Sequence, residues 1–380
     1  MTSISLCMIV KNEEDFLLEC LRSFEDVVDE IVIVDTGSTD KTLEIAERFN
    51  AKIYHFDWID DFAAARNESL KYVTKDWVFI ADADNQLDRD SIPTLKKAIE
   101  RQDALAYSID EHSSFEYNSL ELGLFQIIYR KIFLFRNHFG IKFDGIVHEQ
   151  VYKNILDILE EYPNYKLLDS NIKLFHYGYT PEGIERRIKR NTELTEKLLT
   201  PKDIPIEMEI YHKTSLAELK IKIGKYQEAK EILLYVIEKI KKHNCYGTFG
   251  TYLGLATIYK EENNYQEALK YLKEAINYFP DTPYSYYYTG LIYLRLNNYL
   301  KAMDCFNICI KFGEEKCFNK FIGFNLDILD VFAYLGLGFC YAKLGAIDDA
   351  KIYFEKCLEL KPNFPQAKEA LKIINRFLRI

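Results

Sequence analysis

The strongest constraint on the fold of this chain is a regular spacing of small residues in its second half. Ala256 and Ala268 are followed 34 positions later by Gly290 and Ala302. Small side chains at such intervals let two helices cross closely, and a single helical hairpin cannot bury its own apolar face. The period therefore predicts stacked pairs of helices from about residue 205 onwards.

A further copy of the pattern follows after a longer interval. Gly338 and Ala350 repeat the spacing, but Ala350 comes 48 positions after Ala302, which predicts an insertion around Glu314–Leu326. A degenerate earlier copy includes Ala217. The pattern resembles the tetratricopeptide repeat family, which implies an all-α domain over residues 205–380.

The first half alternates strand-like and helix-like segments. Apolar strand-like runs occupy residues 4–10, 30–35, 51–56 and 76–82. Segments with helical apolar spacing lie between them, at 13–24, 38–50 and 61–73. This order predicts an α/β domain over residues 1–180 with a mostly parallel, Rossmann-like sheet covered by helices on both faces.

A helix bracketed by Pro181 and Pro205 is expected to link the halves over residues 181–204. Its basic residues are candidates for phosphate contact, although a solvated basic face is the favoured interpretation. These residues are Arg186, Arg187, Lys189 and Arg190.

Composition and charge narrow the possible partners. The chain is 48% hydrophobic and 28% charged, as expected for a soluble globular protein, and it has no apolar run of roughly 18 residues that could span a membrane. A formal net charge of -10 argues against nucleic acid as a partner. Eight scattered cysteines without a CxxC pair fit reduced thiols and a cytoplasmic location.

Two carboxylates follow the buried strand in "VFIADADNQL". Asp82 and Asp84 lie two positions apart on an extended chain, so both are expected to point to one side. Close carboxylates repel unless a cation lies between them, and oxygen ligands of this kind favour Mg²⁺ or Mn²⁺. The alternative is a capped turn that uses Asp82 and Asn85.

Two further segments place polar residues at the same edge of the predicted sheet. Asp35, in "VDTGSTDKT", ends a second strand before a glycine turn and a new helix. Arg66, in "DDFAAARNESL", could balance phosphate charge. The alternative for Arg66 is a surface ion pair with Asp60 or Asp61.

Six ordered blocks resemble family 2 glycosyltransferases of the GT-A fold over roughly residues 3–200. They are "CMIVKNEE", "VDTGSTDKT", "DDFAAARNESL", "DWVFIADADNQL", "IFLFRNHFGIKFDGIVHEQV" and "LFHYGY". The "DADN" and "VHE" blocks and the helical repeats are most similar to the sublancin-type enzymes, which attach sugars to cysteine or serine of precursor peptides in glycocin biosynthesis.

The resemblance implies a UDP-sugar site formed by Val10, Asn12, Asp35, Arg66, Asp82 and Ala83. In that site Asp35 holds the uracil or ribose, and Val10 and Asn12 flank the base. Asp82 lies near the ribose.

The resemblance also implies a metal on the diphosphate. Asp84 is the expected ligand, and His176 in "LFHYGY" is a further metal or diphosphate contact, with a core histidine as the alternative. The commonest family pattern has an acid where this chain has Asn85, which removes one possible ligand.

The resemblance also implies inversion by direct displacement, which requires a base on the acceptor side of the sugar. "FDGIVHEQV" offers Asp144, His148 and Glu149. We favour Glu149, with His148 as positioner or alternative base, on a strand that points the two to opposite faces. Asp110 and Glu111 are the competing pair.

The expected function is metal-dependent transfer of a hexose or N-acetylhexosamine from a UDP-sugar to a Cys or Ser side chain of a peptide or protein acceptor. The helical repeats would recruit that acceptor, and their exposed faces are compatible with a homodimer. One alternative acceptor is flagellin or a cell-surface glycan. The other alternative is a scaffold without catalytic activity.

Overall fold

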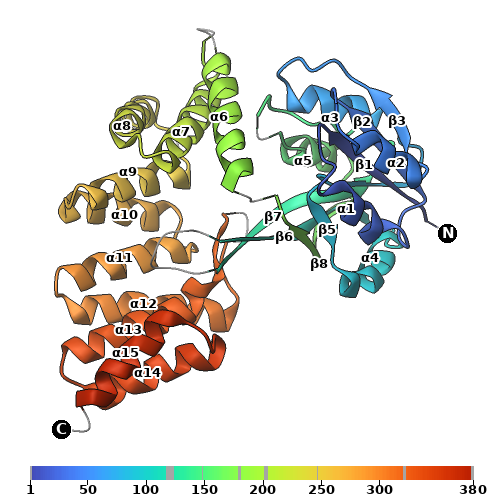
Figure 1. The fold of residues 1–380 in the computed structure, drawn as a ribbon. Coiled ribbons are helices and arrows are strands. Elements are labelled where there is room, and N and C mark those ends of the chain that lie inside the picture. Colours follow the sequence, from blue (N-terminus) through green and yellow to red (C-terminus); the bar gives the residue numbers. More distant parts are fainter. Residues whose placement is uncertain are drawn as a thin grey trace. The chain divides into compact units, whose positions relative to one another are not determined.

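The computed structural model describes residues 2–116, 124–147, 149–178, 181–200, 204–245, 247–319 and 322–377. The chain divides into two compact units (Figure 1). The first consists of Met1–Phe115 with Ile127–Leu194, and the second of Glu116–Gln126 with Thr195–Ile380. The domain limits expected from the sequence stay a prediction.

A mixed, mostly parallel sheet forms the centre of the first unit. Its order is β3-β2-β1-β4-β7-β6-β8-β5. The strands are β1 (Ile4–Val10), β2 (Glu30–Asp35), β3 (Lys52–His55), β4 (Trp77–Ile80), β5 (Asn85–Leu87), β6 (Ala104–Glu116), β7 (Leu124–Arg136) and β8 (Lys166–His176). The first four pair in parallel, as predicted, while β7 joins β4 and β5 joins β8 in antiparallel fashion.

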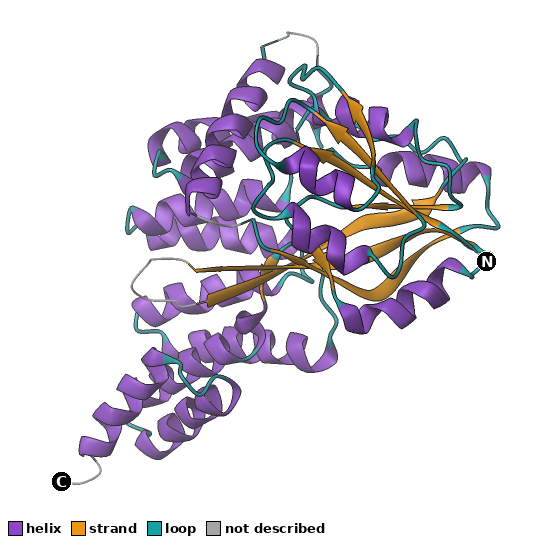
Figure 2. Ribbon diagram, turned by 45° about the vertical axis from the view of Figure 1, so that its right-hand side comes forward, coloured by secondary structure: helices purple, strands orange, loops and turns teal. Residues whose placement is uncertain are grey.

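Helices cover both faces of this sheet (Figure 2). They are α1 (Leu17–Phe24), α2 (Thr42–Arg48), α3 (Phe62–Leu70), α4 (Ile92–Ile99), which follows the 3₁₀ helix η1 (Arg89–Ser91), and α5 (Tyr152–Glu161). Alternate residues of β1 enter different cores, because side chains alternate across a strand. Leu6 and Met8 pack with α1, α2 and α4, whereas Cys7 packs with α3 and α5.

The strand order has a topological switch point at β1. The chain places β2 and β3 on one side of β1 and then returns to place β4 on the other side. The register pairs Cys7 with Ile80, so the carboxyl ends of β1 and β4 reach the same edge. Ligands of open α/β sheets bind at such a point.

The second unit is built from stacked helical hairpins, as the 34-residue period predicts. Its helices are α7 (Ile206–Lys222), α8 (Tyr226–His243), α9 (Phe249–Glu261), α10 (Tyr265–Tyr278), α11 (Pro283–Arg295), α12 (Tyr299–Glu315), α13 (Val331–Lys343), α14 (Ile347–Leu360) and α15 (Pro365–Phe377). Asn263 and Asn297 adopt positive φ angles of 58° and 57° at equivalent turns between paired helices. The repeated Ala268 and Ala302 are fully buried.

The repeat glycines allow close contact between helices. A Cβ at Gly290 would lie 2.8 Å from a ring carbon of Phe306, and one at Gly338 would lie 2.5 Å from Phe354. The insertion predicted before the last repeat contains β9 (Phe324–Asn325) and leads into the 3₁₀ helix η2 (Leu326–Leu329). No helix in the described part of the chain is both long and apolar enough to cross a membrane.

Candidate active site

The turn between β4 and β5 carries the predicted acid pair. Asn85 is fully buried and caps this turn, because its Oδ1 accepts the Asp82 N–H at 2.9 Å. The Asn85 N–H donates in return to the Asp82 carbonyl at 3.0 Å. Ala83 packs into the core at 4% exposure. The capped turn and the acid pair therefore coexist, and the Asn85 cap uses neither the Asp82 nor the Asp84 carboxylate.

Arg66 joins the first acid to a second segment of the chain. This residue of α3 is 4% exposed, and its guanidinium contacts the Asp82 carboxylate. The Arg66 Nε also lies 3.4 Å from Glu149 Oε1. Burial alone would raise the pKa of Asp82, but the charge of Arg66 lowers it to about 2.

The local partners considered for Arg66 are engaged elsewhere. Asp61 caps α3 by accepting the Ala64 N–H at 2.9 Å. Asp60 accepts the indole N–H of Trp58 at 3.0 Å. The surface alternative for Arg66 is therefore wrong, since this buried side chain pairs with Asp82, just after β4, and with Glu149.

The second acid contacts a histidine that is distant in sequence. Antiparallel pairing of β5 with β8 places His176 opposite Asn85, and the Tyr177 N–H donates to the Asp84 carbonyl at 2.9 Å. His176 Nε2 lies 3.1 Å from Asp84 Oδ2. Burial alone would lower the pKa of His176, but the hydrogen bond and charge of Asp84 raise it.

The other oxygen of this acid has unused bonding capacity. Asp84 Oδ1 is buried and has no hydrogen-bond partner among the residues that the structure describes. A buried carboxylate oxygen without a partner is costly unless a ligand satisfies it. This atom therefore fits a cation ligand.

Two residues near Asp84 were missed as site residues. A Cβ at Gly178 would lie 1.8 Å from Asp84 Oδ2, so only glycine lets the chain pass this carboxylate as it stands. Arg187, on α6 (Pro181–Leu198), brings its Nη2 to 3.6 Å from the same oxygen. The favoured interpretation of a solvated basic face is therefore wrong at Arg187, whose side chain is 33% exposed and contacts Asp84.

The part of the site that is expected to bind the nucleoside consists of two loops, which follow β1 and β2 and are held by side-chain hydrogen bonds. The Asp35 carboxylate is 3% exposed and accepts the Gly37 N–H at 3.1 Å and the Ser38 N–H at 3.0 Å. Asn12 has a positive φ of 56°, and its Oδ1 accepts the Thr39 N–H at 2.8 Å. Both side chains shape the loops at this edge, and their role toward a base or ribose stays a prediction.

The end of β1 contributes through its backbone and through an acid that was missed. The Val10 carbonyl accepts the Thr36 N–H at 3.0 Å, which ties β1 to the turn after β2. Beyond it, burial raises the pKa of Glu13 to about 7, and repulsion from Asp84 and Asp82 adds to the effect. Glu13 is thus a third acid that interacts electrostatically with Asp82 and Asp84.

Glu149 lies on a loop, so the expected strand is wrong here. Asp144 and Gln150 form an isolated bridge with two 2.9 Å backbone hydrogen bonds, and Glu149 sits inside the turn that they close. Its side chain is 17% exposed. Burial raises the pKa of Glu149, despite the opposing charge of Arg66. His148 lies outside the described residues.

The competing base candidates are occupied by ion pairs on the long strands. Asp110 binds Arg130 in bidentate fashion, at 2.7 and 3.0 Å. Glu111 is 3% exposed and pairs with Lys131 at 2.6 Å. Glu149 also contacts Arg66, but at 3.4 Å, so it is the least tightly paired of these three acids.

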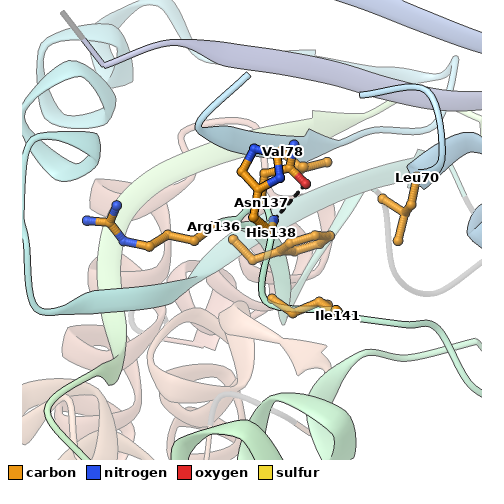
Figure 3. Close-up of a pocket in the computed structure, with 8 residues that line it drawn as sticks. Leu70, Val78, Arg136, Asn137, His138 and Ile141 are labelled. Atoms are coloured by element: carbon orange, nitrogen blue, oxygen red, sulfur yellow. Dashed lines mark hydrogen bonds between the residues drawn. The ribbon is translucent and has the colours of Figure 1, made fainter. Parts of the chain in front are cut away.

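A separate cavity of about 220 Å³ lies toward the other end of β4 (Figure 3). It is lined by Leu70, Val78, Phe135, Arg136, Asn137, His138, Gly140 and Ile141. Val78 belongs to the amino-terminal half of β4, whereas the acids follow the carboxyl end of that strand. This cavity is therefore distinct from the strand-end site.

The strand-end site offers few protein ligands for a metal. Within the described ranges, no three His, Cys, Asp or Glu side chains form a group that could hold an ion. Asp84 Oδ1 fits a divalent cation whose other ligands are phosphate oxygens and water, as is usual for Mg²⁺. His176 Nε2 contacts the other oxygen of this carboxylate, and its role as a metal ligand stays a prediction.

The first unit thus has acids at the switch point of an open α/β sheet, the place where such sheets bind ligands, and the second unit is a stack of helical hairpins. Residues 5–175 match the family described as Glycosyl transferase family 2. Residues 253–308 and 331–364 match tetratricopeptide repeats. The chain therefore carries a family 2 glycosyltransferase domain followed by tetratricopeptide repeats, which confirms the predicted family and fold class.

The chain is also similar to individual proteins. The SPbeta prophage-derived glycosyltransferase SunS of Bacillus subtilis is 27% identical over 316 residues, covering 80% of this chain and 69% of SunS. A TPR repeat-containing protein of Synechococcus elongatus is 35% identical over 189 residues, covering 49% of this chain. The match spans 45% of that relative, less than half of its length.

Proposed function

We propose that this protein transfers a hexose or N-acetylhexosamine from a UDP-sugar to a Cys or Ser side chain of a peptide or protein, with inversion and with a divalent cation. The observation that carries the proposal is the buried, unpartnered Asp84 Oδ1 at the switch point. Family 2 enzymes typically use a nucleotide-sugar donor and a divalent metal. Asp84 lies where such a donor would bind, and its Oδ1 could ligate the metal that holds the donor's diphosphate.

The donor half of the reaction is assigned to the strand ends. Asp84 and His176 would hold Mg²⁺ or Mn²⁺, which when bound neutralises charge that develops on the leaving diphosphate. Asp35 and Asn12 hold the two turns that would enclose the nucleoside. Arg66 fixes the Asp82 carboxylate near the position expected for the ribose.

The acceptor half is assigned to Glu149. Its raised pKa suits a carboxylate that accepts a proton in the transition state, and Arg66 holds it from one side. The acceptor S–H or O–H gives its proton to the Glu149 carboxylate as the sulfur or oxygen bonds to the anomeric carbon. The bond between that carbon and the diphosphate breaks, and UDP leaves with the electron pair.

The acceptor class follows from the repeats and from the relatives. Helical-repeat solenoids present extended surfaces for peptides, which supports a peptide or protein acceptor. The similarity to SunS over 80% of the chain supports the sublancin-type assignment made from the sequence blocks.

The test is metal-dependent turnover with matched peptides. UDP release from UDP-glucose, UDP-galactose and UDP-N-acetylglucosamine is measured with Mn²⁺, together with the mass of Cys- and Ser-containing peptides. We expect Asp84→Asn to abolish UDP release and the exposed Asp90→Asn to retain it. A wild-type chain that binds no UDP with either Mn²⁺ or Mg²⁺ refutes the proposed function.

A further inference from the structure

A guanidinium stands beside the acid that is expected to hold the cation. Arg187 Nη2 lies 3.6 Å from Asp84 Oδ2, and the Arg187 side chain is 33% exposed. His176 contacts the same oxygen at 3.1 Å, while Oδ1 has no hydrogen-bond partner among the described residues. The Asp84 carboxylate therefore has Arg187 near Oδ2, while Oδ1 can accept a cation.

The local structure favours this approach of Arg187. Gly178 has no side chain, and a Cβ there would lie 3.2 Å from Arg187 Nη2 as well as 1.8 Å from the acid. One turn along α6, the Arg190 guanidinium stacks on the Phe62 ring at 4.7 Å, which anchors the helix on α3. The other acid, Asp82, already has Arg66 as its partner.

The positive charge of Arg187 is expected to change the affinities for the two ligands of the site in opposite directions. A bare divalent cation on Asp84 meets the positive charge of Arg187, so the guanidinium weakens its binding. A diphosphate brings several negative charges with arginine-compatible oxygens, so the same guanidinium strengthens its binding. Once the diphosphate is present, the repulsion between Arg187 and the cation is screened by it.

We propose that Arg187 couples cation and diphosphate binding: it competes with the cation for Asp84 in the empty site and contacts the diphosphate when both are bound. This inference rests on the proposed function. Coupling of this kind is reciprocal, so each ligand raises the affinity for the other. The cation is then held firmly only together with a nucleotide.

The experiment measures Mn²⁺ binding with and without UDP, and UDP binding with and without Mn²⁺, by calorimetry. The variants are Arg187→Gln and, as a matched control on the same helix, the exposed Lys189→Gln. For Arg187→Gln we expect roughly 3- to 10-fold tighter Mn²⁺ binding without UDP, and about 10-fold weaker UDP binding with Mn²⁺. The Lys189→Gln control is expected to match wild type in both measurements.

The expected changes in Mn²⁺ and UDP affinity have opposite directions, and this distinguishes coupling from a structural role of Arg187. A structural role for Arg187 would weaken both ligands together, and that result overturns the inference. Unchanged affinities in Arg187→Gln, or wild-type Mn²⁺ binding that does not depend on UDP, also overturn it. In each of these cases wild type still binds UDP, so the proposed function survives.

Discussion

Gly178→Ala is expected to disable the donor site while leaving the fold intact. The new Cβ would lie 1.8 Å from Asp84 Oδ2, whereas carbon and oxygen normally approach to about 3.3 Å. The carboxylate oxygen must therefore move by about 1.5 Å. Oδ1, the expected cation ligand, belongs to the same carboxylate and moves with Oδ2. Because a Mg²⁺–oxygen bond is only about 2.0–2.1 Å long, a shift of this size takes Oδ1 out of bonding distance.

The magnitude follows from this displacement. A misplacement of about 1 Å costs on the order of 100-fold in a preorganised site, so we expect about 100-fold weaker Mn²⁺-dependent UDP binding. This corresponds to about 3 kcal/mol. The atom that must move is the end of a side chain, so the free energy of unfolding should change by about 1 kcal/mol or less.

Two measurements check the reasoning independently of turnover. The contact with Asp84 raises the pKa of His176, so Gly178→Ala should lower that pKa in an NMR titration. In an Asp84→Asn background the substitution should cause little further loss of UDP affinity, because both changes act on one contact. An unchanged His176 pKa with intact UDP affinity would refute the argument.

Three further predictions concern the acceptor side, the pH dependence and the repeats. Glu149→Gln should impair transfer to serine peptides more than to cysteine peptides, since a thiol ionises far more easily; equal losses on matched peptides contradict this. The raised pKa of Glu13 means that the folded state binds the extra proton between about pH 4.5 and 7, so wild-type stability falls across that range. Glu13→Gln should therefore be more stable than wild type by about 1–3 kcal/mol at pH 8 and no more stable at pH 4, as thermal melting can show. Gly338→Ala should cost about 1–3 kcal/mol by overpacking against Phe354, and Phe354→Leu in the same chain should recover part of it in denaturant melts.

The features that sequence reasoning predicted correctly are local or periodic. The strands before Asp35 and Asp82 are apolar runs with clear ends, and the spacing of small residues alone predicts the helical repeats. Asn85 was considered as a cap and does cap the turn. In each case the physical cause lies within a few residues or within a repeated unit.

The features that were missed depend on contacts between distant segments. Nothing near Gly178 in sequence indicates that it passes a carboxylate from another strand. Arg187 was judged with its basic neighbours on one helix, although its contact is with Asp84. The "LFHYGY" block contains Gly178 but pointed to His176, and the basic run of the linking helix made Arg187 a candidate for phosphate contact without indicating Asp84.

The pairing of β5 with β8 has a consequence for how this chain can be divided into fragments. The family match ends at residue 175, one position before His176, and so before Gly178 and Arg187 as well. A fragment cut at that limit would keep both strand-end acids but lose His176 and Arg187, the side chains in the described part of the chain that contact the Asp84 carboxylate. The matched region of this chain therefore ends before the residues that complete the surroundings of Asp84.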